Sequence, residues 1–180
     1  IKSSAASDVY KRQHYQRPIS GERVQMDTCK IAHGLYQYTA VDDCTRYRVL
    51  RVYARRTANN TLDFLDRVLE EMPFPVQRIQ TDRGREFFAV IVQERLKRYG
   101  IKFRPNKPAS PRLNGKVERS QETDKIEFYS TIDLSSPELD MLLAEWQRYY
   151  NWERPHSAHS GKTPMERYCE LMEQTHYLKR

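Results

Sequence analysis

The sequence predicts an α/β fold in which one mixed sheet carries helices on its faces. Three segments with strand-like alternation come first and are joined by short links, which is the pattern of an antiparallel meander. Segments with a helical period then alternate with short strand-like segments, and this order favours parallel βαβ connections. We therefore expect five strands, three antiparallel and two parallel, flanked by helices.

The leading strands are indicated by alternation and by β-branched and aromatic side chains. They are expected over 21–27, 35–41 and 46–53. Val24 and Met26 share one face of the first strand, and a loop over 30–34 follows it. Asp42 and Asp43 come at the turn before the third strand, and we interpret them as turn and salt-bridge residues rather than metal ligands.

Apolar residues that recur at three and four positions predict the first helix over 62–72, which Pro73 and Pro75 end. Thr57 and Asn60 are the two candidates for its N-cap. The elements expected next are a strand over 76–82, a helix over 88–99, a strand over 101–104 and a helix that begins between 111 and 115.

The last predicted helix is expected to begin at a cap formed by Ser136, with Pro137 in its first turn. Its aromatic stripe is assigned to the core or to a protomer interface rather than to base stacking: Trp146, Tyr149 and Tyr150. Residues 151–180 are polar and are expected to wrap the surface. His156 and His159 are interpreted as surface residues rather than metal ligands.

The 180 residues are enough for one domain with a buried core. We expect a leader or linker over 1–18, a core over 19–168 and a C-terminal tail over 169–180. Lysine and arginine number 31 against 24 acidic residues, which gives a formal net charge of +7. This balance favours an acidic partner such as nucleic acid, although a merely basic protein would have the same composition.

The composition argues against several classes of protein. Three cysteines, none in a Cys-x-x-Cys pair, argue against a disulfide scaffold and a zinc ribbon and favour a reducing cytoplasm. The longest apolar runs, such as 87–92, are too short to cross a bilayer, so we expect no membrane partner. Residues 1–13 have no apolar segment of the kind found in secretory signals. The first residue is Ile1 rather than Met, which favours a fragment.

Three acidic residues are the candidate catalytic group. Asp27 and Asp82 each come at the expected end of a strand, where ligands gather in open α/β sheets, and Glu118 follows on a helix. Three carboxylates suit hard cations such as Mg²⁺ or Mn²⁺, and two such ions can promote phosphoryl transfer. The spacing alone is explained at least as well if Asp27 and Asp82 are turn residues at strand ends and Glu118 lies on a solvated helix face.

Four sequence segments change that comparison. They are VQMD (24–27), AVDDCTRY (40–47), QTDRGREF (80–87) and PRLNGKVER (111–119), with 35 residues between Asp82 and Glu118. In this order they resemble the catalytic core of the DDE integrases, which include bacterial insertion-sequence transposases and retroviral-type integrases. Two closing segments, 150–157 and 162–168, are similar to the end of that core in the bacterial branch. The resemblance covers about 19–168.

The resemblance implies an RNase H-like fold in which Asp27, Asp82 and Glu118 are the catalytic residues and bind two Mg²⁺ ions, for which Mn²⁺ can substitute. It implies that water frees a 3′-hydroxyl at the end of a mobile element and that this hydroxyl then attacks target DNA. Expected partners are therefore element ends, target DNA and further copies of the chain, as a homodimer or larger assembly. The expected location is the bacterial cytoplasm, at the nucleoid.

Two alternatives remain at this stage. One is a related nuclease that only hydrolyses DNA, and the other is an inactive DNA-binding remnant. Family members usually carry a separate DNA-binding domain before the core, and none is visible in the sequence, which again favours a fragment.

Basic and polar residues near the acids are candidates for contact with DNA phosphates. They are Arg83, Lys107, Arg112, Asn114, Lys116 and Arg119. Lys116 is the strongest candidate, because the family often has a basic or polar DNA contact near that position. A solvated surface position explains most of the others as well, and Asn114 also shapes the start of the helix together with Gly115. Glu86 is expected to support the acidic site rather than to touch substrate.

Overall fold

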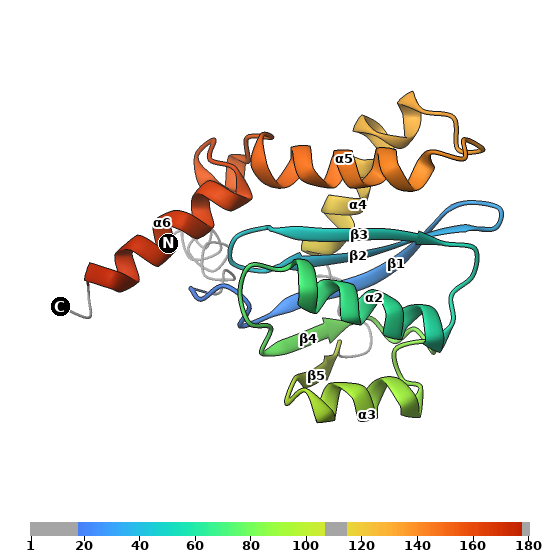
Figure 1. Ribbon diagram of the computed structural model, residues 1–180, viewed down its shortest axis with the longest axis horizontal. Helices are drawn as coiled ribbons and strands as arrows, with labels where there is room; N and C mark the ends of the chain where they lie inside the picture. The colour runs from blue at the N-terminus through green and yellow to red at the C-terminus, as the bar shows by residue number, and fades with distance from the viewer. Residues whose placement is uncertain (1–17, 107–114, 178–180) are drawn as a thin grey trace, which may run out of the picture.

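The computed structural model describes residues 18–106 and 115–177. Its five-stranded sheet has the order β3-β2-β1-β4-β5, as Figure 1 shows. The strands are β1 (Val24–Ala32), β2 (Leu35–Asp42), β3 (Arg48–Tyr53), β4 (Arg78–Thr81) and β5 (Lys102–Pro105). Neighbours among β1, β2 and β3 are antiparallel, whereas β4 lies parallel to both β1 and β5. The predicted mixed sheet is confirmed.

Helices cover both faces of this sheet (Figure 1). They are α2 (Ala58–Glu71), α3 (Val90–Arg98), α4 (Gly115–Glu127), α5 (Leu139–Trp152) and α6 (Pro164–Tyr177), with short 3₁₀ turns at Tyr129–Thr131 and Ser157–His159. Helices α2 and α3 pack against each other, α4 packs on β1 and β2, and α5 packs on β3. No helix in the described ranges has the length and apolarity that crossing a bilayer requires.

The face under α2 and α3 is the apolar core. Val24 and Met26 from β1 pack there with Phe64 and Val68 of α2 and Leu96 of α3, all fully or almost fully buried. Side chains alternate across a strand, so Gln25 and Asp27 point to the opposite face, towards α4. Strand β1 therefore divides its side chains between an apolar core and a polar layer.

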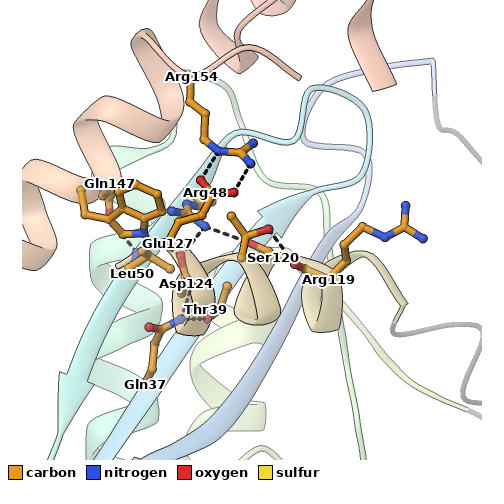
Figure 2. Close-up of polar contacts among 12 residues, drawn as sticks. Gln37, Thr39, Arg48, Leu50, Arg119, Ser120, Asp124, Glu127, Gln147 and Arg154 are labelled. Carbon is orange, nitrogen blue, oxygen red and sulfur yellow. Dashed lines mark hydrogen bonds and ion pairs between the residues drawn. The ribbon is translucent and has the colours of Figure 1, made fainter. Parts of the chain in front are cut away.

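The polar layer holds α4 in place through hydrogen bonds, because α4 has almost no apolar surface of its own. The residues that α4 buries are Val117, Ser120, Gln121 and Asp124. The carboxylate of Asp124 lies 2.6 Å from the Arg48 guanidinium of β3 and accepts hydrogen bonds from Gln37 Nε2 and Trp146 Nε1, each at 2.7 Å (Figure 2). Arg48 also donates to Ser120 Oγ at 3.0 Å, and its guanidinium lies 3.2 Å from the centre of the Tyr150 ring.

Several expected boundaries need correction. Strand β1 continues to Ala32 instead of ending near Asp27, and the expected loop is a two-residue turn at His33 and Gly34. Ser136 does not cap α5, whose N-cap is Glu138, although the Ser136 hydroxyl does accept a hydrogen bond from the Glu138 N–H. Of the two candidates for the α2 cap, Thr57 is the one whose hydroxyl accepts from Asn60 N–H.

The C-terminal region is more ordered than expected. Helix α6 runs through residue 168, where the sequence analysis placed the end of the core, and Tyr168 packs against the apolar core. A capping box starts this helix, since Thr163 Oγ1 accepts from Glu166 N–H and Glu166 Oε2 accepts from Thr163 N–H. The sequence analysis expected this region to wrap the surface and predicted no helix in it, so α6 is an addition to that expectation.

The two histidines of this region are not simple surface residues. His159 is buried, and its Nε2 lies 2.9 Å from the Thr45 carbonyl oxygen, to which a neutral ring donates. His156 packs edge-on against Tyr150, with ring centres 4.6 Å apart. Burial, with help from the Arg154 charge, lowers the pKa of His156 to about 4, and burial also lowers the pKa of His159.

We expect the protein to lose stability as the pH falls from about 6.5 towards 4. The pKa of His156 is lower in the folded chain than in the unfolded chain, so the unfolded state takes up the proton first. Because the ring is only partly buried, the loss is about 1–2 kcal/mol, less than the full shift would give. Urea unfolding at pH 7 and pH 4.5 measures it in the wild type and in His156→Gln. Equal losses in the two proteins would contradict this assignment.

Candidate active site

Asp27 lies inside β1 and not at the strand end that the sequence predicted. It is opposite Thr39 of β2 in the antiparallel register. On its other side, the parallel pairing with β4 stops one residue earlier, at Met26 and Thr81. Asp27 therefore occupies the first position of β1 beyond the end of β4, which still places it at the carboxyl end of the parallel pair.

Asp82 follows β4 directly and is held by the turn after it. Its Oδ1 accepts a hydrogen bond from the Gly84 N–H at 2.9 Å. A Cβ atom at residue 84 would lie 2.9 Å from Glu86 Oε2 and 3.1 Å from Asp82 Oδ1, so a side chain would crowd both carboxylates. A larger residue at this position would therefore force one or both carboxylate side chains to shift.

Glu118 lies in the first turn of α4 and is exposed. The pKa of the Asp27 carboxyl is raised to about 7, mainly by burial and also by the negative charges of Asp82 and Glu118. The Thr28 N–H, which donates to Asp27 Oδ1 at 2.9 Å, and a Gln121 side chain act in the opposite direction. Asp27 and Asp82 directly follow Met26 and Thr81, which pair in the sheet, and Val117 N–H of α4 donates to Gln25 Oε1 of β1. The segments that carry the three predicted acids therefore lie near one another.

Across residues 18–106 and 115–177, no group of three or more His, Cys, Asp or Glu side chains is arranged to hold a metal ion. The donor chemistry of the three acids nevertheless fits a divalent cation, because carboxylates supply hard oxygen ligands and a cation would offset the repulsion that raises the pKa of Asp27. Glu118 is exposed on its helix, so its side chain can change rotamer without disturbing the core.

Glu86 links the segments that carry the two aspartates. It is buried, and its Oε1 accepts a hydrogen bond from Thr28 Oγ1 at 2.9 Å. Thr28 follows Asp27 on β1, and Glu86 belongs to the turn that begins at Asp82, so this bond ties the two segments together. The guanidinium of Arg56 lies 3.9 Å from the Glu86 carboxylate. Sequence reasoning missed Arg56, which precedes α2 and gives no local signal of its place beside the acids.

The predicted turn residues beside the site form a buried anchor for the start of α4. Asp42 accepts hydrogen bonds from Gly21 N–H, Thr45 N–H and Thr45 Oγ1. Asp43 forms ion pairs with Arg23 and Lys116. The interpretation of Asp42 and Asp43 as turn and salt-bridge residues is confirmed.

The candidate DNA contacts have different surroundings. Lys116 is paired with Asp43, and burial lowers its pKa to about 8, so its ammonium group is not a solvated surface charge. Arg119 and Arg83 are exposed, and the Arg83 guanidinium lies 5.7 Å from the centre of the Phe88 ring. The remaining candidates lie outside the described residues: Lys107, Arg112 and Asn114. Contact of any of these residues with DNA remains a prediction.

Comparison with known proteins agrees with this architecture. A family model described as "Integrase core domain" matches residues 17–111, and a second model with the same description matches residues 99–164. The uncharacterized protein K02A2.6 of Caenorhabditis elegans is 26% identical over 145 residues, which is 81% of this chain. The ORF3 product of Spiroplasma virus SpV1-C74 is also 26% identical, over 146 residues and 72% of this chain.

This chain spans 11% and 40% of the lengths of those two relatives. Among solved structures, the catalytic core of BIV integrase has a TM-score of 0.69 and 22% identity, with 87% of this chain and 99% of that chain covered. The catalytic core of HTLV-2 integrase, solved with magnesium, has a TM-score of 0.68 and 20% identity over 82% of this chain and 96% of that one.

At these identities the solved structures establish the fold, which is the RNase H-like fold of retroviral integrase cores. The two family models together extend from residue 17 to residue 164 and include Asp27, Asp82 and Glu118. The chain belongs to the integrase core domain family.

Proposed function

We propose that this chain is the catalytic core of an enzyme that joins 3′-hydroxyl ends of a mobile DNA element to target DNA. The observation that supports this most directly is that Asp27 and Asp82 follow paired residues of β1 and β4, beside the first turn of α4 that carries Glu118, in a chain of the integrase core domain family. Carboxylates on neighbouring segments are suited to binding divalent cations and to phosphoryl transfer.

Asp27, Asp82 and Glu118 would hold two Mg²⁺ or Mn²⁺ ions, as the magnesium bound to the HTLV-2 core supports. When bound, such ions supply Lewis-acid stabilisation of the phosphate and activation of the attacking oxygen. The chain itself orients the acids. Thr28 N–H fixes the Asp27 carboxylate, Gly84 N–H fixes that of Asp82, and the polar layer fixes the helix that carries Glu118.

The proposed reaction exchanges one phosphodiester bond for another. The 3′-hydroxyl oxygen attacks phosphorus in line, the bond to the target-strand 3′-oxygen breaks, and the leaving oxygen takes up a proton. No bond between the DNA and the chain is needed. Exposed Arg83 and Arg119 lie close in sequence to the acids and would contact phosphates beside the reacting one. DNA is the proposed substrate, and assembly into a dimer or larger complex is proposed from the dimeric and trimeric forms of the HTLV-2 core.

A branched DNA tests this function without knowledge of the element ends. The exchange is nearly thermoneutral and therefore runs in both directions. A duplex that already carries a joined end beside a nick with a 3′-hydroxyl should thus be resealed, with release of the branch, when Mg²⁺ or Mn²⁺ is added. Gel electrophoresis of the labelled nicked strand detects the longer resealed product.

Other outcomes would overturn the proposal. Shortened fragments without any resealed strand would identify a nuclease that only hydrolyses. DNA binding without either product, in both Mg²⁺ and Mn²⁺, would identify a binding protein without catalysis. Chelation by EDTA is the control, because it should abolish the resealed product and leave the protein folded.

A further inference from the structure

On the α4 side of the sheet, β4 and β5 carry basic side chains, of which Lys102 and Arg104 are exposed. On the other face of these strands, Ile79, Thr81 and Phe103 pack in the apolar region beneath α2 and α3. Because side chains alternate, the intervening residues point to the α4 side of the sheet. Helices α4 and α5, however, pack on β1, β2 and β3. The basic residues of this face are Arg78, Lys102 and Arg104.

The sheet register places these three cations next to one another. Arg78 pairs with Lys102, and Gln80 pairs with Arg104, in the parallel ladder. Lys102 and Arg104 are exposed, and Arg78 is half-buried. None of the ion pairs found within the described ranges involves any of the three. The face therefore carries positive charge that described carboxylates do not offset.

The same face leads to the acidic site. Gln25 of β1 and Gln80 of β4 are neighbours in the register, and Asp27 and Asp82 each lie two residues further along. Two strand residues span about 7 Å, so the Arg104 row lies roughly one nucleotide step from the level of the acids. A strand of DNA whose phosphate is at the acids would find its neighbouring phosphates opposite these cations.

We propose that this β4–β5 basic face, formed by Arg78, Lys102 and Arg104, binds the phosphates of duplex DNA and guides it to the acidic site. The inference rests on the proposed function, because the acidic site is what makes DNA the fitting polyanion. Lysine and arginine on a sheet face contact phosphates without reading bases, so the binding is independent of sequence.

A matched pair of variants tests this inference. Lys102→Gln/Arg104→Gln removes one lysine and one arginine from the basic face, and Lys97→Gln/Arg98→Gln removes the same two types from the end of α3, where both are exposed. Helix α3 packs on the opposite side of β5. Binding to two unrelated 30-base-pair duplexes is measured by fluorescence anisotropy without divalent cations, between 50 and 200 mM salt.

A plot of log K against log salt has a negative slope, and we expect this slope to be less steep by about 1.8 in Lys102→Gln/Arg104→Gln. Binding near 0.1 M salt should be at least tenfold weaker. Both effects should be equal for the two duplexes. The α3 variant should keep the wild-type slope. Arg78→Gln, a milder change, should lower the slope by about 0.9. Thermal melting confirms that each variant is folded.

An equal decrease in the salt dependence of DNA binding in the basic-face and α3 variants would overturn the inference, because the change in net charge alone would then explain the decrease. An unchanged slope in Lys102→Gln/Arg104→Gln, in a protein that still reseals the branched DNA, would overturn the basic face and leave the proposed function intact. A wild type that reseals no branched DNA would overturn the proposed function itself.

Discussion

Asp82→Asn is expected to reduce joining of DNA in Mg²⁺ by at least about a thousandfold without unfolding the protein. Replacing the carboxylate removes a negative oxygen that would hold a divalent cation, and loss of several kcal/mol of transition-state stabilisation corresponds to that factor. Asparagine has the same size, and its Oδ1 can still accept the hydrogen bond from Gly84 N–H. The resealing assay with branched DNA measures the rate, and circular dichroism monitors the fold.

Two glutamates on α4 provide the matched control. Glu118→Gln should cause a similar loss, whereas Glu122→Gln removes the same charge from an exposed position one helical turn later and should change the rate less than threefold. Of these two glutamates, only Glu118 has a charge that contributes to raising the pKa of Asp27. Normal activity of Asp82→Asn, or equal losses in the two glutamine variants, would show that the acidic group is not catalytic.

Asp124→Asn is expected to destabilise the fold by about 3–5 kcal/mol, because it leaves the guanidinium of Arg48 without a counter-charge in the interior. Arg48 and Asp124 are both completely buried, and they lie 2.6 Å apart. The carboxylate also accepts hydrogen bonds from Gln37 and Trp146, so one substitution weakens contacts to β2, β3 and α5 at once (Figure 2). Urea unfolding followed by tryptophan fluorescence measures the change.

The same helix contributes Glu127 to an ion pair with Arg154 that lies partly in solvent and serves for comparison. Glu127 accepts hydrogen bonds from Arg154 at 2.5 and 2.8 Å, with both side chains partly in solvent (Figure 2). Glu127→Gln should cost no more than about 1 kcal/mol, as is usual for surface pairs. If Asp124→Asn costs as little as Glu127→Gln, the buried pair does not hold α4 to the sheet.

Local pattern was sufficient to predict the sheet, because alternation and helical period are set by which face of each element is buried. Local pattern was not sufficient where a strand has two different neighbours in the sheet, because each neighbour can end at a different residue. A loop was expected over 30–34, yet β1 continues to Ala32 by pairing with β2 after β4 has ended. Asp27 was predicted to lie at the carboxyl end of the parallel strands because β1 would end there. It does lie at that end, but the reason is that β4 stops at Thr81 while β1 continues.

Other differences arise from contacts between residues distant in sequence. The pairing of Lys116 with Asp43 needs the turn after β2 to meet the start of α4, and no spacing rule encodes that meeting. The buried place of His159 depends in the same way on Thr45. Helix α6 is a different case, because its Thr163–Glu166 capping box is visible in the sequence and was overlooked.

The three acids differ in the backbone structure that holds them. Asp27 lies in the interior of β1, where pairing with Thr39 of β2 restricts its backbone conformation. Asp82 is held by the Gly84 N–H in its turn, and the start of α4 is held by the contact of Lys116 with Asp43. The Glu118 side chain is exposed, so adaptation to a substrate requires only a rotamer change there while the backbone around all three acids keeps its shape.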